Sequence, residues 1–183
     1  IDQRSLPLDG RFSVRGISNK DVFIYLLDSG VRITHDEFQY SDGTTNAFHG
    51  KDVVQGLDYA VDCVGHGTHV AGVIAGRSYG VAKRATPISV RVLSCGGFAY
   101  TSALITGLQF VLEDSRTLNR RPAVVSMSLI APESSAVNSM VRQVYEQGIP
   151  VVTAAGNTNQ DSCKFSPASE PTAITVAASN RDD

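Results

Sequence analysis

Three side chains of the kinds that catalyse acyl transfer occur in short, glycine-containing settings. Asp28 ends an apolar run, His66 stands between two glycines, and Asn157 directly follows a third. An aspartate can orient a histidine that acts as a general base. An asparagine carboxamide can donate a hydrogen bond to a developing oxyanion, a contact worth about 3 to 4 kcal/mol. Their joint occurrence in this order predicts a site for nucleophilic catalysis.

Each of these residues, taken alone, has a purely structural explanation. Asp28 is followed by Ser-Gly, a common turn composition, and Asn157 after its glycine can equally form a turn. His66 and His69 are spaced for one face of a helix, but no glutamate lies between them and no third ligand is evident. We therefore predict no metal site, and only the combination of acid, base and amide favours catalysis.

Alternating strand and helix patterns must position these side chains. The run 21–27 is almost continuously apolar, as expected for a strand that is covered on both faces within a parallel sheet. Segment 40–62 is rich in glycine and polar residues and is expected to be a surface loop. The order of elements predicts an α/β fold with a mostly parallel sheet of at least five strands. The other predicted strands are 88–93, 123–129, 149–155 and 172–178, and the predicted helices are 66–75, 101–114 and 134–146.

Functional sites in such a fold lie at the carboxyl ends of the strands, where an open parallel sheet leaves a crevice. Asp28 closes the first predicted strand, and Gly30 permits the chain to leave that strand in a tight turn. Asn157 follows the predicted strand 149–155, and His66 begins a helix whose flanking glycines allow close approach to its imidazole. We therefore expect the acid, the base and the amide to meet in one crevice.

Length, charge and hydropathy restrict the kind of protein and of partner. The 183 residues, 42% of them hydrophobic, suit one domain with a sizeable core. Lys and Arg (16) nearly balance Asp and Glu (18), so that no basic field favours nucleic acid or an anionic membrane. No apolar stretch approaches the roughly 20 residues that span a bilayer. The first residue is not followed by a leader-like segment, and we expect the precursor end to have been removed or omitted.

The three cysteines, Cys63, Cys95 and Cys163, form no Cys-x-x-Cys pair of the kind that binds zinc or exchanges disulfides. Cys63 lies just before the predicted helix 66–75 and Cys95 just after the predicted strand 88–93, which makes these two a plausible pair in an oxidising compartment. Such a bridge is worth about 2 to 4 kcal/mol. Three buried, reduced thiols are the alternative, because free cysteine is commonly buried. We predict an exported protein.

Taken together, these motifs resemble those of a known family. The chain resembles the subtilisin-like serine proteases, and within them the proteinase K group, over nearly its whole length. The resemblance implies a three-layer fold with helices on both faces of the sheet. It also implies that Asp28 orients His66, that His66 deprotonates a serine, and that Asn157 is the side-chain half of an oxyanion hole. The matching passages are Ile1 to Arg4, Tyr25 to Gly30, Gly65 to Gly72, Tyr79 to Lys83, Ala154 to Asn157 and Ser166 to Pro171.

The same resemblance implies where a peptide substrate binds. In that family the substrate forms an extra strand between two stretches of enzyme backbone, here Ser128-Leu129-Ile130 and the segment around Gly96-Gly97-Phe98. Ala154 and Gly156 are further candidates for substrate binding. The family has Leu-Gly-Gly where this chain has Leu129-Ile130-Ala131. The branched Ile130 is expected either to narrow the first specificity pocket or to be a tolerated surface substitution, because β-branched residues suit an extended backbone.

The nucleophile of such a site is not evident in the chain. No serine lies in the Gly-Thr-Ser-Met-Ala type of setting that the family uses. We therefore expect residues 1–183 to be a single peptidase domain that is incomplete at its carboxyl end and inactive as it stands, with the serine and the disulfide partner of Cys163 beyond Asp183. The alternative is a catalytically inactive subtilase-like module that binds other molecules or has a structural role. A nucleotide-binding α/β domain is set aside, since no Gly-x-Gly-x-x-Gly or Gly-Lys-Ser/Thr motif follows a strand.

The resemblance also implies cofactors, partners and location. No cofactor is required, but calcium is a candidate structural ion near the carbonyls of Pro171 and Ala173, where the carboxylate that would complete the site is absent. The expected partners are a peptide or protein substrate and an inhibitory propeptide, with neither nucleic acid nor a membrane span. A secreted or lumenal location is expected.

Overall fold

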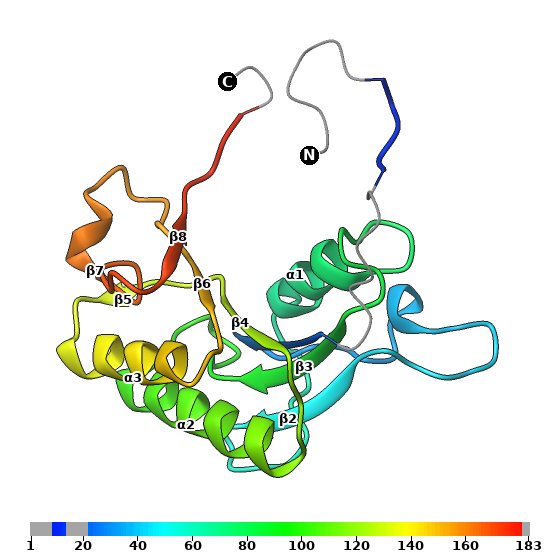
Figure 1. Ribbon diagram of the computed structural model, residues 1–183, viewed down its shortest axis with the longest axis horizontal. Coiled ribbons are helices and arrows are strands. Elements are labelled where there is room, and N and C mark those ends of the chain that lie inside the picture. The colour runs from blue at the N-terminus through cyan, green and yellow to red at the C-terminus, as the bar shows by residue number, and fades with distance from the viewer. Residues whose placement is uncertain (1–8, 14–21, 181–183) are drawn as a thin grey trace.

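A parallel β-sheet runs through the middle of the molecule. The computed structural model describes residues 9–13 and 22–180. Within these ranges six strands form one sheet in the order β2-β3-β1-β4-β6-β8, and every neighbouring pair is parallel. The carboxyl ends of the strands therefore lie at the same end of the sheet (Figure 1). The strands are β1 (Phe23–Asp28), β2 (Phe48–Asp52), β3 (Thr86–Arg91), β4 (Ala123–Met127), β6 (Val151–Ala154) and β8 (Ile174–Val176).

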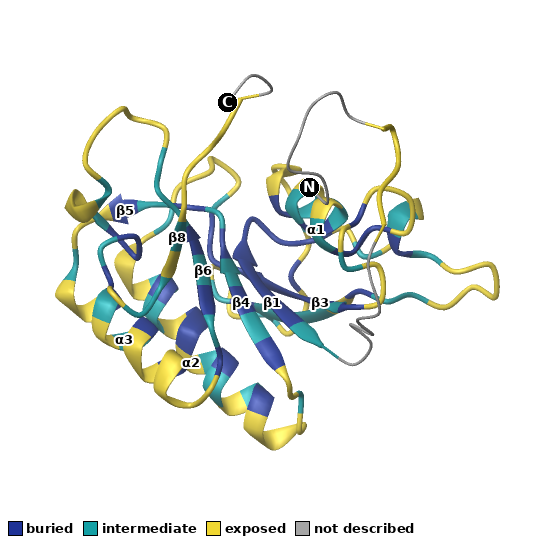
Figure 2. Ribbon diagram, turned by 45° about the horizontal axis from the view of Figure 1, so that its top comes forward, coloured by how far each residue is buried: buried dark blue, intermediate teal, exposed yellow. Residues whose placement is uncertain are grey.

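Helices cover both faces of this sheet, so that the fold has three layers. Helices α2 (Thr101–Thr117) and α3 (Ser135–Glu146) pack on one face, and α1 (His66–Ala75) packs on the other (Figure 1). In β1, Tyr25 belongs to the core under α2 and α3, whereas the adjacent Ile24 belongs to the core under α1. The buried residues concentrate along the strands between these layers (Figure 2). The predicted three-layer α/β arrangement with a mostly parallel sheet is thereby confirmed.

Strand β2 corrects one prediction. Segment 40–62, expected to be a surface loop, contains β2, which pairs in parallel with β3 at the edge of the sheet. Only Asp52 among its five residues is buried, so the strand lacks the apolar pattern that predicted the others. The bounds of the remaining predicted elements differ from the observed ones by at most three residues, and α1 has the predicted bounds.

Short elements join the loop after β4 to the loop after β6. The hydroxyl of Ser166 accepts a hydrogen bond from the backbone N–H of Ser134, the residue that caps α3. In the next turn, the buried Glu170 pairs with Arg142 of α3 at 2.9 Å. No helix in the described part of the chain is long and apolar enough to cross a membrane. The two loops are joined by the antiparallel strands β5 (Ala131–Pro132) and β7 (Phe165–Ser166), and the 3-10 helix η2 (Ser162–Lys164) directly precedes β7. A second 3-10 helix, η1 (Asp36–Phe38), lies elsewhere, between β1 and β2.

Candidate active site

Asp28 and His66 form a hydrogen-bonded pair at the carboxyl end of the sheet. Asp28 Oδ1 lies 2.7 Å from His66 Nδ1, and the same oxygen accepts a hydrogen bond from the backbone N–H of Ser29. The Asp28 side chain is 2% exposed and the His66 side chain 48% exposed. Because a carboxylate can only accept this hydrogen bond, Nδ1 is the donor, and in a neutral imidazole Nε2 then has the lone pair. The pair therefore combines a buried acid with a half-exposed imidazole, the arrangement that a general base requires.

Two glycines let the end of β1 and the start of α1 approach each other. Gly30 has a φ of +103°, and a Cβ there would lie 2.6 Å from the backbone carbon of Val61. A Cβ on Gly67 would collide with the carbonyl oxygen of Gly30. A side chain at Gly67 would therefore push the start of α1 away from the end of β1, and one at Gly30 would displace the loop that leads into α1.

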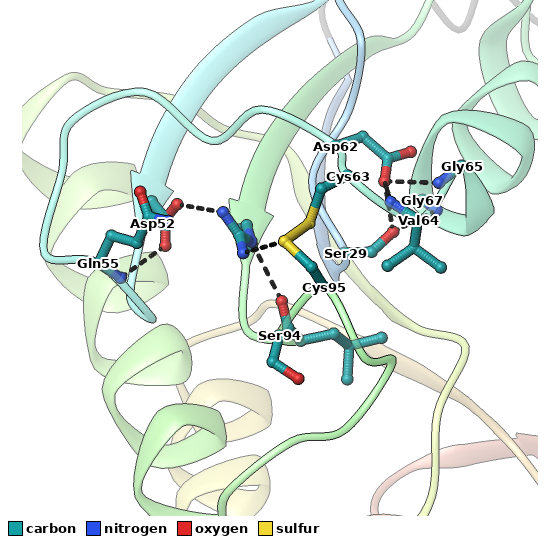
Figure 3. Close-up of a disulfide and its surroundings, with 12 residues drawn as sticks. Ser29, Asp52, Gln55, Asp62, Cys63, Val64, Gly65, Gly67, Ser94 and Cys95 are labelled. Carbon is teal, nitrogen blue, oxygen red and sulfur yellow. Dashed lines mark hydrogen bonds and ion pairs between the residues drawn. A yellow bond between two sulfur atoms is a disulfide. The ribbon is translucent and has the colours of Figure 1, made fainter.

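Asp62 holds the loop that leads into α1. One of its carboxylate oxygens accepts hydrogen bonds from the Ser29 hydroxyl and from the backbone N–H groups of Val64 and Gly65 (Figure 3). The other accepts hydrogen bonds from both the backbone N–H and the hydroxyl of Thr68. Burial alone raises the pKa of Asp62, but the hydrogen bonds from Thr68, Gly65 and Val64 together lower it below 3.8. The carboxylate thus stays ionised at the amino end of the helix, where negative charge is favoured.

A disulfide joins this loop to the loop after β3. Cys63 and Cys95 are bonded, with their Cα atoms 5.3 Å apart (Figure 3). The pairing predicted from the sequence is present, and the alternative of three reduced thiols is wrong. Cys163 is exposed, not buried as that alternative required. The bridge connects the segment just before His66 to the segment that contains Gly96 and Gly97.

A buried arginine supports the disulfide from the sheet. Arg91 Nη1 lies 2.9 Å from Asp52 Oδ2, and the two side chains are almost fully buried. The same guanidinium donates hydrogen bonds to the carbonyl of Leu93 and to Cys95 Sγ. Arg91 therefore links the edge strand β2, the end of β3 and the disulfide. This ion pair also explains why a strand with so few apolar residues ends at a buried aspartate.

A cavity brings His66 together with both predicted substrate-binding segments. The cavity has a volume of about 440 Å³, and its lining includes His66, Gly97, Phe98 and Ser128-Leu129-Ile130. Gly96 does not line it and lies beside the ring of Phe98. The base and the two backbone stretches therefore share one hollow, as expected if an extended peptide lies between those stretches.

A second, adjacent cavity contains Asn157. It has a volume of about 340 Å³ and is lined by Ser128, Ala154, Gly156 and Asn157 among others. Gly156 has a φ of +96° and turns the chain at the end of β6. Asn157 is exposed, and among the described residues its carboxamide makes no hydrogen bond. Because Ser128 lines both cavities, the cavity that contains His66 and the cavity that contains Asn157 are adjacent.

The carboxylate next to the carbonyls predicted for a structural calcium ion already has other partners. Glu170, the carboxylate next to Pro171 in the sequence, is buried and accepts hydrogen bonds from Arg142 and Thr172. It is therefore not free to complete a set of carbonyl ligands that includes Pro171 and Ala173. More generally, the described residues contain no group of three or more His, Cys, Asp or Glu side chains that could hold a metal ion.

Two features of the site were not predicted from the sequence, the role of Asp62 and the ion pair of Arg91 with Asp52. Asp62 lies a few residues before the first residue of α1, and an acidic residue near a helix start is a recognisable capping signal. The pair of Arg91 with Asp52 left no comparable signal, because it depends on strand β2, which the sequence pattern did not predict.

Comparisons with known proteins agree on one kind of domain. The profile of the Subtilase family, Peptidase S8, matches residues 19–183. An extracellular serine proteinase of Thermus sp. (strain Rt41A) is 43% identical over 183 residues, which are 100% of this chain and 42% of that protein. A cuticle-degrading serine protease of Arthrobotrys oligospora is 46% identical over 155 residues, which are 85% of this chain and 37% of that protein.

A solved structure supports the same relationship. The structure of a cold adapted subtilisin-like serine proteinase matches with a TM-score of 0.90 and 40% sequence identity, and the match covers 98% of this chain and 62% of that one. The chain therefore spans less than two thirds of the length of each of these three proteins.

Proposed function

This chain belongs to the subtilase family, and we propose that it supplies the acid, the base and an oxyanion donor of a serine endopeptidase that hydrolyses peptide bonds. The observation that carries the proposal is the 2.7 Å contact between buried Asp28 and half-exposed His66. In the proposal the nucleophile is a serine that lies outside residues 1–183, and the chain alone does not turn over substrate.

The proposed reaction is acyl transfer. His66 Nε2 takes the proton of the serine hydroxyl as the serine oxygen attacks the peptide carbonyl. Asp28 keeps the proton on Nδ1 and stabilises the imidazolium that forms. The Asn157 carboxamide donates a hydrogen bond to the oxyanion. His66 then gives its proton to the leaving amine, and water, activated by the same imidazole, releases the acyl group.

The proposed substrate is an extended peptide. Its backbone would pair with Ser128-Leu129-Ile130 on one side and with Gly96-Gly97-Phe98 on the other, by strand addition. The cavity that holds His66 together with Gly97 and residues 128–130 supports this placement. Ala154 and Gly156 line the neighbouring cavity with Asn157 and are proposed to contact the same peptide near the scissile bond.

The proposed setting is outside the cytosol. The Cys63–Cys95 disulfide and a relative that is named as an extracellular proteinase support a secreted or lumenal protein. An inhibitory propeptide is a proposed second occupant of the substrate site. We propose no required cofactor, and the mechanism uses none.

Labelling of the natural full-length protein with a fluorophosphonate probe tests the proposal. We expect one labelled serine, located by mass spectrometry beyond Asp183, and loss of labelling in His66→Ala. The matched control is His69→Ala, which changes an exposed histidine of the same helix that lines neither site cavity. A folded, complete protein that takes up no label would contradict the proposal and favour a subtilase-like module that binds without turnover.

A further inference from the structure

The side chain of Ile130 bridges the two loops that frame the candidate site. A Cβ on Gly156 would lie 2.8 Å from Ile130 Cδ1, 3.6 Å from its Cγ2 and 3.8 Å from its Cγ1. The isoleucine therefore reaches from the loop after β4 to the α-carbon of the loop after β6. These two strands are neighbours in the sheet, as Figures 1 and 2 show.

The backbone around Ile130 leaves this side chain little freedom to move away. The preceding residue, Leu129, is buried. The following residues, Ala131 and Pro132, pair with β7 in the short antiparallel ladder. β-branching also restricts χ1 of the side chain on this backbone. Ile130 is thus held across the gap between the loops.

The position of the reacting carbonyl sets which substrate side chain meets Ile130. A carbonyl that undergoes the proposed attack must lie between His66, which takes the proton, and Asn157, which donates to the oxyanion. These residues line adjacent cavities that share Ser128. The strip between Ser128 and Gly156 joins these cavities and so lies within reach of the side chain of the substrate residue that bears this carbonyl. Ile130 reaches across that strip to Gly156.

We infer that Ile130 restricts the substrate residue on the amino side of the scissile bond to glycine, alanine or serine. The inference rests on the proposed function and adds a substrate class to it. Gly156 has no side chain and Ala154 has only a methyl group, so that Ile130 contributes the largest obstacle among the residues of this strip. A phenylalanine or leucine could enter only if Ile130 left its contact with Gly156. The alternative of a tolerated surface substitution predicts no such preference.

A substrate series that varies only this residue tests the inference. The natural full-length protein is assayed with otherwise identical peptides that carry Gly, Ala, Leu or Phe before the scissile bond. We expect kcat/KM for Ala to exceed that for Phe by about 100-fold or more, as for a pocket that excludes the larger side chain. In Ile130→Gly, kcat/KM for Phe should rise by about 100-fold, while that for Ala changes by only a few fold.

Two smaller changes separate a local effect from a general one. Ile130→Val removes only the δ-methyl that contacts Gly156 and should raise the Leu/Ala ratio by several fold. Ile174→Val makes the same chemical change in an exposed residue of β8 that lines neither cavity, and it should leave every ratio unchanged.

The outcomes for this inference and for the proposed function can be told apart. A wild-type protein that labels with fluorophosphonate but cleaves after Phe as well as after Ala overturns the role of Ile130 and leaves the protease assignment intact. An unchanged Phe/Ala ratio in a folded Ile130→Gly variant overturns it too. A folded protein that neither labels nor cleaves any peptide of the series overturns the proposed function, and the inference falls with it.

Discussion

The acid–base side of the candidate site and its Asn157 side differ in how firmly the described residues hold them. Asp28 is buried, and the loop before His66 is held by the Asp62 carboxylate and by the Cys63–Cys95 disulfide. Asn157 is exposed, makes no side-chain hydrogen bond among the described residues, and is placed by the backbone turn at Gly156.

This difference matches the work proposed for each side. A general base must be aimed at its proton and kept in one tautomer before substrate arrives, which requires a buried acid and a fixed helix start. An oxyanion donor needs only to reach the developing charge and to remain unoccupied until then. Changes on the acid–base side should therefore cost more activity than a change at Asn157.

The largest expected effect is the loss of the base. His66→Ala should lower kcat of the full-length protein by about 10⁶-fold, the general scale for deleting one member of a triad that acts as a unit. Steady-state hydrolysis of a peptide with Ala before the scissile bond measures this. His69→Ala should retain normal turnover, and a His66→Ala protein with normal turnover would contradict the assignment of the base.

Asp28→Asn should have the next largest effect. The amide is nearly the size of the carboxylate but cannot fix the same tautomer or stabilise the imidazolium, so that kcat should fall by about 10⁴-fold. Circular dichroism and the melting temperature verify that the variant folds. If this loss of kcat were smaller than the loss caused by Asn157→Ala, the acid–base side would not be the more important side for turnover.

Asn157→Ala should cost less because it removes one hydrogen bond to the oxyanion. We expect kcat to fall by about 100- to 1000-fold, with KM changed little, since the contact forms only as charge develops. Asn159→Gly is the matched control: Asn159 has a φ of +54°, which glycine adopts without strain, and it lines neither cavity. A larger rise in KM than fall in kcat would indicate a role in binding substrate instead.

Stability should show the same asymmetry between the two sides. Replacing both Cys63 and Cys95 by serine should lower the free energy of unfolding by about 2 to 4 kcal/mol. On the other side, Asp161→Ala removes the side chain that caps η2 and should lower the free energy of unfolding by clearly less than that, because this cap is exposed. Urea unfolding of the full-length protein compares the two. Equal losses would mean that the disulfide does not hold the acid–base side more firmly.

The sequence predicted the parts of the molecule whose signals are local. The apolar run of β1 and the small-residue pattern of α1 each lie within one stretch of chain, and both elements formed close to or at their expected bounds. Strand β2 was missed because its pairing with β3 needs backbone hydrogen bonds and hardly any apolar side chains. Local sequence patterns therefore predict the central strands of the sheet better than the edge strand β2.

The site divides in the same way. Asp28 and His66 stand in recognisable motifs, and the structure brings them into contact. The reach of Ile130 to Gly156 could not be measured from the sequence, because it depends on the spacing between two strands that are adjacent in the sheet and far apart in the chain. The catalytic role of Asn157 remains a prediction.

The smallest expected effect concerns pH and the loop that leads into α1. The folded-state pKa of Asp62 is lowered below 3.8, because hydrogen bonds to its carboxylate outweigh the effect of burial. A depressed pKa means that this group stabilises the folded protein at pH values above its unfolded pKa, and that the contribution is lost as pH falls through the folded pKa. Asp62→Asn should thus melt at a lower temperature than wild type at neutral pH. The difference between the two melting temperatures should shrink steadily below pH 3.8.

The exposed Asp58, which among the described residues pairs with Lys51 on the surface, provides the control Asp58→Asn, for which little difference is expected at any pH. A difference for Asp62→Asn that stays constant down to the acid transition would show that its carboxylate does not hold the start of the helix through its charge.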